Sequence, residues 1–220
     1  MEAKVYSVAN QKGGVGKSTI TTLLASALSN KYKVAVVDCD NQKSITNYRA
    51  MEATTFSEVT PPYLIESLHH RFLHDFLKMN SHKYDIIFID IPRITEEAEG
   101  GSVLQILAMC EGVLIPFLGG LYEILSTKNF IKAVEVMAKY KAENNIEFKY
   151  FGVLNRNSRR SENKETVEYL EAEGLNVFDH SLNNLKVFST PSTMFSILED
   201  PEGKSRFEPF FIEFCKKFEL

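Results

Sequence analysis

A short glycine-rich segment between an apolar strand and an amphipathic helix constrains this chain more than any other feature. The segment reads Asn10-Gln11-Lys12-Gly13-Gly14-Val15-Gly16-Lys17-Ser18-Thr19. A strand is expected before it, from Lys4 to Ala9, and a helix after it, where apolar residues recur at i, i+3, i+4, i+7 and i+8: Ile20, Leu23, Leu24, Ala27 and Leu28. Glycines let successive backbone N–H groups point into one concavity, and the helix adds its positive N-terminal end. The segment is therefore predicted to form an anion cradle.

Strands and helices alternate along the rest of the chain, which predicts an α/β fold with three layers. In such a fold a mostly parallel, twisted sheet carries helices on both faces. Further strands are expected at Val34–Val37, Ile86–Ile89, Val113–Phe117 and Tyr150–Leu154. Helices are expected around Tyr63–Met79, Glu96–Cys110, Leu121–Glu143, Glu162–Glu173 and Arg206–Phe218. With no repeat and no linker, residues 1–220 are predicted to be one domain.

Composition narrows the class of protein further. The net charge of −4 argues against a protein that coats nucleic acid with its whole surface, so any DNA contact must be local. Cys39, Cys110 and Cys215 are far apart in sequence, which fits a reducing cytoplasm better than a disulfide framework or a metal cluster. No apolar run approaches the roughly 20 residues that span a bilayer. The first strand begins too early to leave space for an N-terminal helix-turn-helix reader.

The residues at the end of the glycine-rich segment have side chains suited to a nucleotide with its metal ion. Lys17 is predicted to reach the β- and γ-phosphates, the Ser18 hydroxyl to coordinate Mg²⁺, and Thr19 to add a phosphate contact. The general P-loop pattern expects glycine where this chain has Gln11.

This departure is informative, because Lys-Gly-Gly-Val-Gly-Lys-Ser resembles the deviant Walker A loop of the ParA and MinD ATPases. The resemblance implies a single P-loop ATPase domain that binds ATP and Mg²⁺. It also implies that Lys12 reaches across a dimer interface to the phosphates of the other subunit. The predicted nucleotide-binding residues are Gly13, Gly14, Val15, Gly16, Lys17, Ser18 and Thr19.

Carboxylates end two of the predicted strands, and in open α/β sheets ligands gather at such ends. The segment Asp38-Cys39-Asp40-Asn41-Gln42 is similar to the first switch of the family, in which Asn41 is usually proline. The resemblance assigns Asp40 to orienting the attacking water and Asp38 to the Mg²⁺ shell. Asp90, which ends an apolar strand as a Walker B carboxylate does, is predicted as an outer-shell Mg²⁺ residue. Arg93 stands where the family usually has a second proline.

Asn155 follows the strand that ends at Leu154 and resembles the adenine-contacting asparagine of the family. An amide offers both a donor and an acceptor to a purine edge. The alternative is an asparagine that only forms a turn.

A basic segment follows Asn155. It contains one acidic residue, Glu162, and four basic residues, Arg156, Arg159, Arg160 and Lys164. The segment could therefore bind DNA phosphates without sequence preference. A solvated loop face is the alternative interpretation.

The C-terminal segment places Phe207, Phe211, Phe214 and Phe218 on one helical face, as in the membrane anchor of MinD. Its three glutamates outnumber its two lysines, whereas membrane-seeking helices are usually basic, so we expect it to pack onto the core. His70 and His74 have the i, i+4 spacing of paired metal ligands but are expected on a surface helix face.

The leading hypothesis is a cytoplasmic, possibly nucleoid-associated ParA-like ATPase without a DNA-reading domain. The resemblance implies an ATP-dependent homodimer, binding of nonspecific DNA, and slow hydrolysis stimulated by a ParB-like partner, acting in DNA partition. Two alternatives stay open: a membrane-cycling positioning ATPase of the MinD type, and a P-loop metabolic ligase of the dethiobiotin synthetase type.

Overall fold

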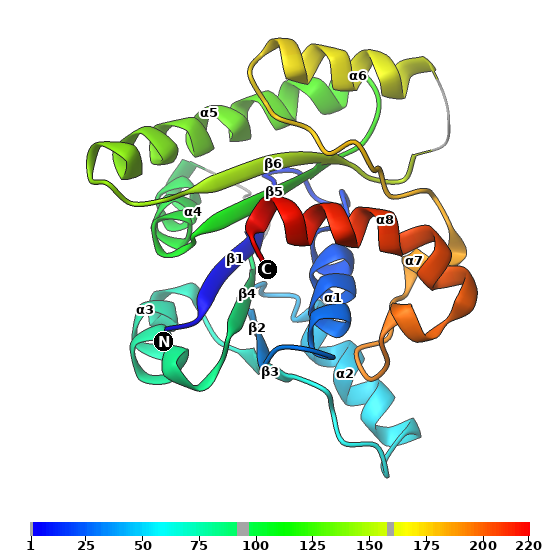
Figure 1. Cartoon of the computed structure of the whole chain (residues 1–220). Helices are drawn as coiled ribbons and strands as arrows, with labels where there is room; N and C mark the ends of the chain where they lie inside the picture. Colours follow the sequence, from blue (N-terminus) through cyan, green and yellow to red (C-terminus); the bar gives the residue numbers. More distant parts are fainter. Residues whose placement is uncertain (1, 92–96, 158–160) are drawn as a thin grey trace.

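A parallel sheet forms the centre of the protein (Figure 1). The computed structural model describes residues 2–91, 97–157 and 161–220 of the chain. In this part, six strands lie in the order β3-β2-β4-β1-β5-β6, and every neighbouring pair is parallel. Their bounds are β1 Lys4–Val8, β2 Val34–Asp38, β3 Leu64–Ser67, β4 Ile86–Asp90, β5 Gly112–Phe117 and β6 Lys149–Leu154.

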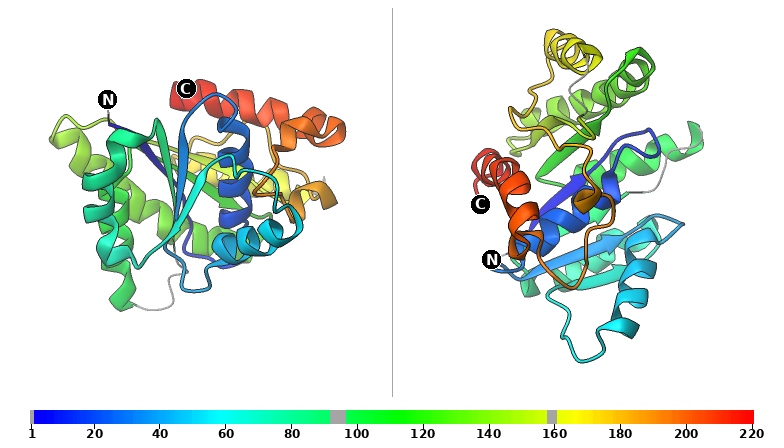
Figure 2. Two further views of the ribbon diagram at one scale, coloured as in Figure 1. Left: turned by 90° about the horizontal axis from the view of Figure 1, so that it is seen from below. Right: turned by 90° about the vertical axis from the view of Figure 1, so that its right-hand side faces the viewer.

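Helices cover both faces of this sheet (Figure 2), which confirms the predicted three-layer α/β class. Helices α3, α4, α5 and α6 contribute to the core on one face, and α1, α2, α7 and α8 to the core on the other. Their bounds are α1 Lys17–Leu28, α2 Ser44–Thr55, α3 Leu73–Asn80, α4 Glu97–Met109, α5 Leu121–Glu143, α6 Ser161–Ala172, α7 Lys186–Ser189 and α8 Pro201–Phe218. Short 3₁₀ turns lie at His70–Phe72, Ser81–Lys83 and Ile197–Glu199.

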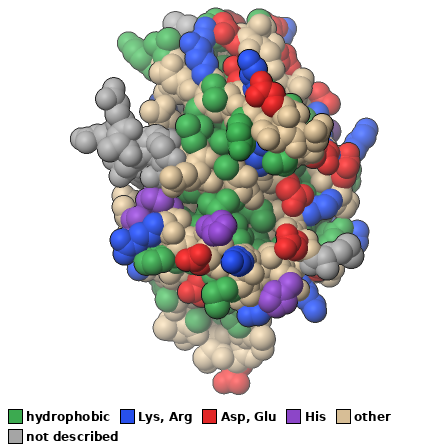
Figure 3. Space-filling view, turned by 90° about the vertical axis from the view of Figure 1, so that its left-hand side faces the viewer, with side chains coloured by type: hydrophobic (Ala, Val, Ile, Leu, Met, Phe, Trp, Pro, Cys, Tyr) green, Lys and Arg blue, Asp and Glu red, His purple; other side chains and the backbone are tan. Residues whose placement is uncertain are grey.

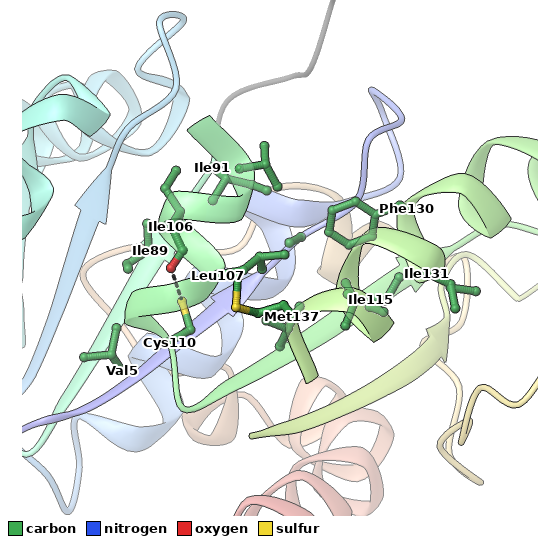
Figure 4. Close-up of a cluster of buried hydrophobic side chains, with 14 of the residues drawn as sticks. Val5, Ile89, Ile91, Ile106, Leu107, Cys110, Ile115, Phe130, Ile131 and Met137 are labelled. Carbon is green, nitrogen blue, oxygen red and sulfur yellow. Dashed lines mark hydrogen bonds between the residues drawn. The ribbon is translucent and has the colours of Figure 1, made fainter. Parts of the chain in front are cut away.

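The side chains of the central strands are buried on both faces, as expected for a parallel sheet between two helical layers. Val5 of β1 packs in the core beneath α4 and α5, whereas the next residue, Tyr6, packs against α8. Figure 4 shows the first of these cores, where Ile106 and Leu107 of α4 meet Phe130 of α5 above the sheet. These two apolar cores hold the sheet between its helical layers.

The predicted helix from Tyr63 to Met79 is wrong in its first half. Leu64–Ser67 forms the edge strand β3, paired with β2, and the α-helix begins only at Leu73. As an edge strand, β3 has exposed and half-buried side chains in alternation, so it lacks the continuous apolar run that marks the inner strands. Helix α2 has no counterpart among the predicted elements, because Ile45 and Glu52 are its only buried residues.

His70 and His74 do not share a helix, since His70 lies in a 3₁₀ turn and His74 in α3. Within the described ranges, no three His, Cys, Asp or Glu side chains are grouped in a way that could hold a metal ion. No helix in the same ranges is both long and apolar enough to cross a membrane.

The C-terminal helix α8 packs onto the sheet, as expected. It begins at Pro201, earlier than predicted, because the Asp200 carboxylate caps it by accepting a hydrogen bond from Gly203 N at 2.6 Å. Its most deeply buried aromatic residues are Phe207, Phe210, Phe214 and Phe218, whereas Phe211, which was predicted on this face, is only partly buried.

A pair of substitutions in α8 tests this packing. Phe214 is 1% exposed, so Phe214→Ala is expected to lower the free energy of unfolding by about 3–5 kcal/mol. Ile212, on the same helix but 60% exposed, is the matched control, and Ile212→Ala should change it by no more than about 0.5 kcal/mol. Urea denaturation measures both. Similar losses in the two variants would contradict a core-packed α8.

Candidate functional site

The glycine-rich segment lies between β1 and α1, where its backbone turns sharply. Gly14 and Gly16 have φ angles of +77° and +99°, in the left-handed region that favours glycine. A Cβ atom on Gly16 would lie 2.1 Å from the Asn155 amide nitrogen, so a larger residue would have to displace the Asn155 side chain. Strand, loop and helix thus occur in the predicted order, with α1 beginning at Lys17.

Two lysines meet within this loop. Lys17 is 6% exposed, and its ammonium group donates a hydrogen bond to the carbonyl oxygen of Lys12 at 3.0 Å. Lys12 itself is half-buried. A buried cation at the N-terminus of a helix, where the helix dipole is also positive, is an arrangement that favours an anion.

Asn10 anchors the loop to the neighbouring strand and helix, a role that the sequence did not reveal. Its side-chain oxygen accepts a hydrogen bond from Lys12 N at 3.1 Å. Its amide nitrogen donates to Pro116 O at 2.8 Å and to Thr127 Oγ1 of α5 at 3.3 Å. Asn10 is fully buried, and no spacing rule links it to partners more than 100 residues away.

Asp90 lies at the carboxyl end of β4, directly beside the loop, because Val8 and Asp90 are register partners. Its Oδ2 accepts a hydrogen bond from Ser18 Oγ at 2.6 Å. Its Oδ1 is buried and has no hydrogen-bond partner among the described residues. Burial raises the pKa of Asp90 to about 7, although the bond from Ser18 acts in the opposite direction. An orphaned carboxylate oxygen beside a hydroxyl fits a hard cation such as Mg²⁺.

Asp38 ends β2 at the same edge of the sheet and is the register partner of Asp90. Both of its oxygens have partners: Oδ2 accepts from Thr46 N at 3.0 Å and Thr46 Oγ1 at 2.8 Å, and Oδ1 accepts from Asp40 N at 3.2 Å. Asp38 therefore binds the first turn of α2 and holds it against the end of β2. Asp40 is half-buried, and its Oδ1 accepts from Gln42 N at 2.9 Å, which shapes the loop before α2.

Asn155 contacts the loop from the far end of the sheet. Its amide nitrogen donates to Val15 O at 2.8 Å, and its oxygen accepts from Arg156 N at 2.9 Å. The structure thus shows that Asn155 holds the loop. Its contact with adenine stays a prediction. A concavity at this point is lined by Thr19, Asn155, Arg156, Asn183, Asn184, Leu185, Phe188 and Ser189, and it is the candidate site for the predicted base contact.

The structure describes only two of the four residues of the predicted basic patch, Arg156 and Lys164. Arg156, with a φ of +54°, lines the concavity beside Asn155 and so has a position next to the candidate base site. Lys164 is exposed on α6 and lies 3.5 Å from Glu168. Arg159 and Arg160 lie outside the described residues, as does Arg93.

A second concavity, which we call the α1–α2 cleft, borders the loop on its other side. Helix α1 and helix α2 form two of its walls, and the segment before Ser192 forms the third. The lining residues are Ser18, Thr19, Thr22, Ser44, Ile45, Tyr48, Ser189, Thr190 and Pro191. The sequence indicated Ser18 and Thr19 but not the residues of α2 or of 189–191.

The chain is similar to known proteins. The family profile described as CobQ/CobB/MinD/ParA nucleotide binding domain matches residues 6–192. Maintenance of carboxysome distribution protein A of Halothiobacillus neapolitanus is 26% identical over 196 residues, which cover 85% of this chain and 82% of that protein.

Two solved structures share the fold. A variant of McdA from Cyanothece in complex with ATP has a TM-score of 0.76 at 17% identity, covering 100% of this chain and 97% of that one. A putative plasmid partition protein from Borrelia burgdorferi bound to AMPPNP has a TM-score of 0.67 at 21% identity, covering 99% and 100%.

Replacement of Asp90 by asparagine separates stability from function. Because burial raises its pKa from 3.8 to about 7, Asp90 lowers the free energy of unfolding progressively as the pH rises from about 4 to about 7. Asp90→Asn should therefore raise the free energy of unfolding at pH 8 by about 1–3 kcal/mol, and by less at pH 5.5. The same variant should lose the thermal stabilisation that we expect magnesium and nucleotide to give the wild type.

Urea denaturation at the two pH values and thermal shift with and without magnesium nucleotide provide the measurements. Ser18→Ala is the companion variant, because it removes the hydroxyl but leaves the buried carboxylate in place. An Asp90→Asn protein that is less stable than the wild type at pH 8 would contradict this account.

Proposed function

Because this chain belongs to the CobQ/CobB/MinD/ParA nucleotide-binding family, we propose that it is a ParA-like ATPase that positions a cargo through an ATP-driven dimer cycle. One observation carries the proposal: the buried Asp90 carboxylate, with an unpartnered oxygen, lies against Ser18 at the start of α1. A carboxylate is stable there when a cation shares the site, and a P-loop binds the phosphate anion that accompanies that cation.

The residues of the site suit this chemistry. Lys17 holds positive charge inside the loop, Ser18 and Asp90 provide oxygens for Mg²⁺, and Asp38 shapes the loop beside them. Asp40 is assigned to orienting the water that attacks the γ-phosphate. Such a reaction depends on positioning and charge neutralisation more than on covalent chemistry, so these few groups suffice. The bound metal would neutralise charge on the phosphates.

Lys12 is proposed to complete the site of a partner protomer. In this structure its carbonyl oxygen accepts the Lys17 hydrogen bond. Nucleotide phosphates are stronger acceptors for Lys17 than a backbone carbonyl, because both partners are then charged. Binding of ATP would therefore release the carbonyl of Lys12 and let this residue turn toward a second copy of the chain. The dimer would thus depend on bound nucleotide.

The proposed cellular role is cargo positioning in the cytoplasm, with nonspecific DNA as the matrix and a ParB-like protein as the activator. The names of the relatives support it, since one maintains carboxysome distribution and another is a plasmid partition protein. Acidic, basic and histidine side chains are interspersed over the face seen in Figure 3, so DNA contact is proposed elsewhere, at Arg156, Arg159, Arg160 and Lys164.

The two competing functions receive less support. A MinD-type anchor would need the apolar face of its C-terminal helix at a lipid surface, whereas Phe207, Phe210, Phe214 and Phe218 of α8 are buried in the core. Lys12 counts against a dethiobiotin synthetase-type ligase, and the lining of the α1–α2 cleft contains no basic residue that would bind an acid substrate.

Sedimentation of three proteins with MgATP or MgADP, with and without duplex DNA, tests the proposal. The wild type is expected to dimerise with MgATP alone and to co-sediment with DNA only as a dimer. Asp40→Ala should trap the ATP dimer because hydrolysis stops. Lys12→Ala should bind ATP but remain monomeric, and it serves as the control for DNA binding that does not depend on the dimer.

Salt provides a second check. Co-sedimentation with DNA should weaken steeply as salt rises, since phosphate contacts release counterions. A wild type that stays monomeric with MgATP and ignores DNA would rule out the partition-type cycle and direct the search to a small-molecule substrate.

A further inference from the structure

Helix α2 is held in place mainly by polar contacts. Of its twelve residues, only Ile45 and Glu52 are buried, and the helix contributes little to either core. Apolar burial therefore fixes the position of α2 weakly. Two groups of hydrogen bonds hold it instead: the bonds from Thr46 to Asp38 at its first turn, and a cluster around Glu52 at its third turn.

Glu52 is 7% exposed and accepts three short hydrogen bonds from the segment that follows α7. Its Oε1 accepts from Ser192 Oγ at 2.7 Å. Its Oε2 accepts from Thr193 N at 2.7 Å and from Thr193 Oγ1 at 2.6 Å. Hydrogen bonds to a buried carboxylate are stronger than those between neutral groups, so this contact is directional and firm.

Arg49, one turn earlier in α2, donates two hydrogen bonds to the same threonine. Its Nη2 donates to Thr193 O at 2.8 Å, and its Nε donates to Thr193 Oγ1 at 2.8 Å. Its Nη1 donates to Tyr63 O at 3.0 Å, and the guanidinium carbon lies 4.6 Å from the centre of the Tyr63 ring. Every polar group of the fully buried Thr193 is thus bound by α2.

The cluster joins two walls of the α1–α2 cleft. Ser44, Ile45 and Tyr48 form the wall on α2, and the opposite wall ends at Pro191, two residues before Thr193. The third wall is the start of α1, which continues directly from the glycine-rich loop. The width of a cleft beside the phosphate site therefore depends on the bonds to Thr193.

We propose that Arg49, Glu52 and Thr193 form a positioning latch that sets the width of the α1–α2 cleft for the bound nucleotide. The inference rests on the proposed nucleotide function and deepens it. None of the three latch residues lines the cleft, so the latch acts by positioning the residues that do. Since α2 also carries Thr46, which binds Asp38, the latch connects the metal-binding edge of the sheet with segment 189–193.

Substitutions that keep the size of the side chain test the latch. Glu52→Gln removes the charge and places an amide N–H donor beside groups that already donate to Glu52, namely those of Ser192 and Thr193. Thr193→Val removes the hydroxyl. Thr193→Ser keeps the hydroxyl and is the conservative rescue. Val134→Ala is the stability control, because fully buried Val134 lies in the core on the opposite face of the sheet.

The measurements are the dissociation constant of a fluorescent ATP analogue, kcat and KM for ATP, and hydrogen exchange of residues 44–48 and 189–193. Glu52→Gln and Thr193→Val should weaken binding by about tenfold, the equivalent of one charged hydrogen bond, and raise KM more than they lower kcat. Thr193→Ser should bind as the wild type does. Both segments should exchange faster in the first two variants, with and without nucleotide.

Val134→Ala should lower the melting temperature without changing the dissociation constant. If the two latch variants behave as Val134→Ala does, the latch proposal is overturned while the nucleotide function stands. If the wild type itself binds no nucleotide, the proposed function fails, and the latch proposal fails with it. If Glu52→Gln does not fold, the comparison of Thr193→Val with Thr193→Ser decides.

Discussion

The contact between Ser18 and Asp90 is the interaction on which the rest of the site depends. It joins the first residues of α1 to the end of β4, and it places a carboxylate with one unpartnered oxygen in the interior of the protein. Such a group is costly to bury, and only a firm framework keeps it in place. Here the framework is a parallel sheet whose strands β2, β4 and β1 are adjacent, so Asp38, Asp90 and the loop after Val8 meet at one edge.

The parts of the protein differ in how they are held. The sheet, α1 and α8 are fixed by two dense apolar cores, and close-packed cores change shape only at high cost. Helix α2 and the segment around Thr193 are fixed by hydrogen bonds between charged and polar groups. Hydrogen bonds can exchange partners in discrete steps, so these two segments are the ones suited to respond to a nucleotide while the cores remain unchanged.

Sequence reasoning succeeded where the signal was local. The loop from Asn10 to Thr19 follows β1, and Asp38 and Asp90 end β2 and β4, three strands whose apolar runs are easily recognised; the positions of these residues were predictable, and their roles stay predictions. It failed for β3 and α2, because neither buries a regular apolar face. The cluster at Thr193 was not predictable either, since its partners are more than 140 residues away and only the fold brings them together.

The charge balance of the site explains why ATP would act as a switch. In this structure Lys17 binds the carbonyl of Lys12, a neutral acceptor, while the ionised form of Asp90 is disfavoured by burial. Lys17 lies near enough to Asp90 to lower the pKa of that carboxyl, so the two charges already offset each other in part. A nucleotide with its metal would provide both partners together, an anion for Lys17 and a cation for Asp90. A magnesium nucleotide adds an anion and a cation at once and so keeps this balance of charge, which favours the complete magnesium nucleotide over either component alone.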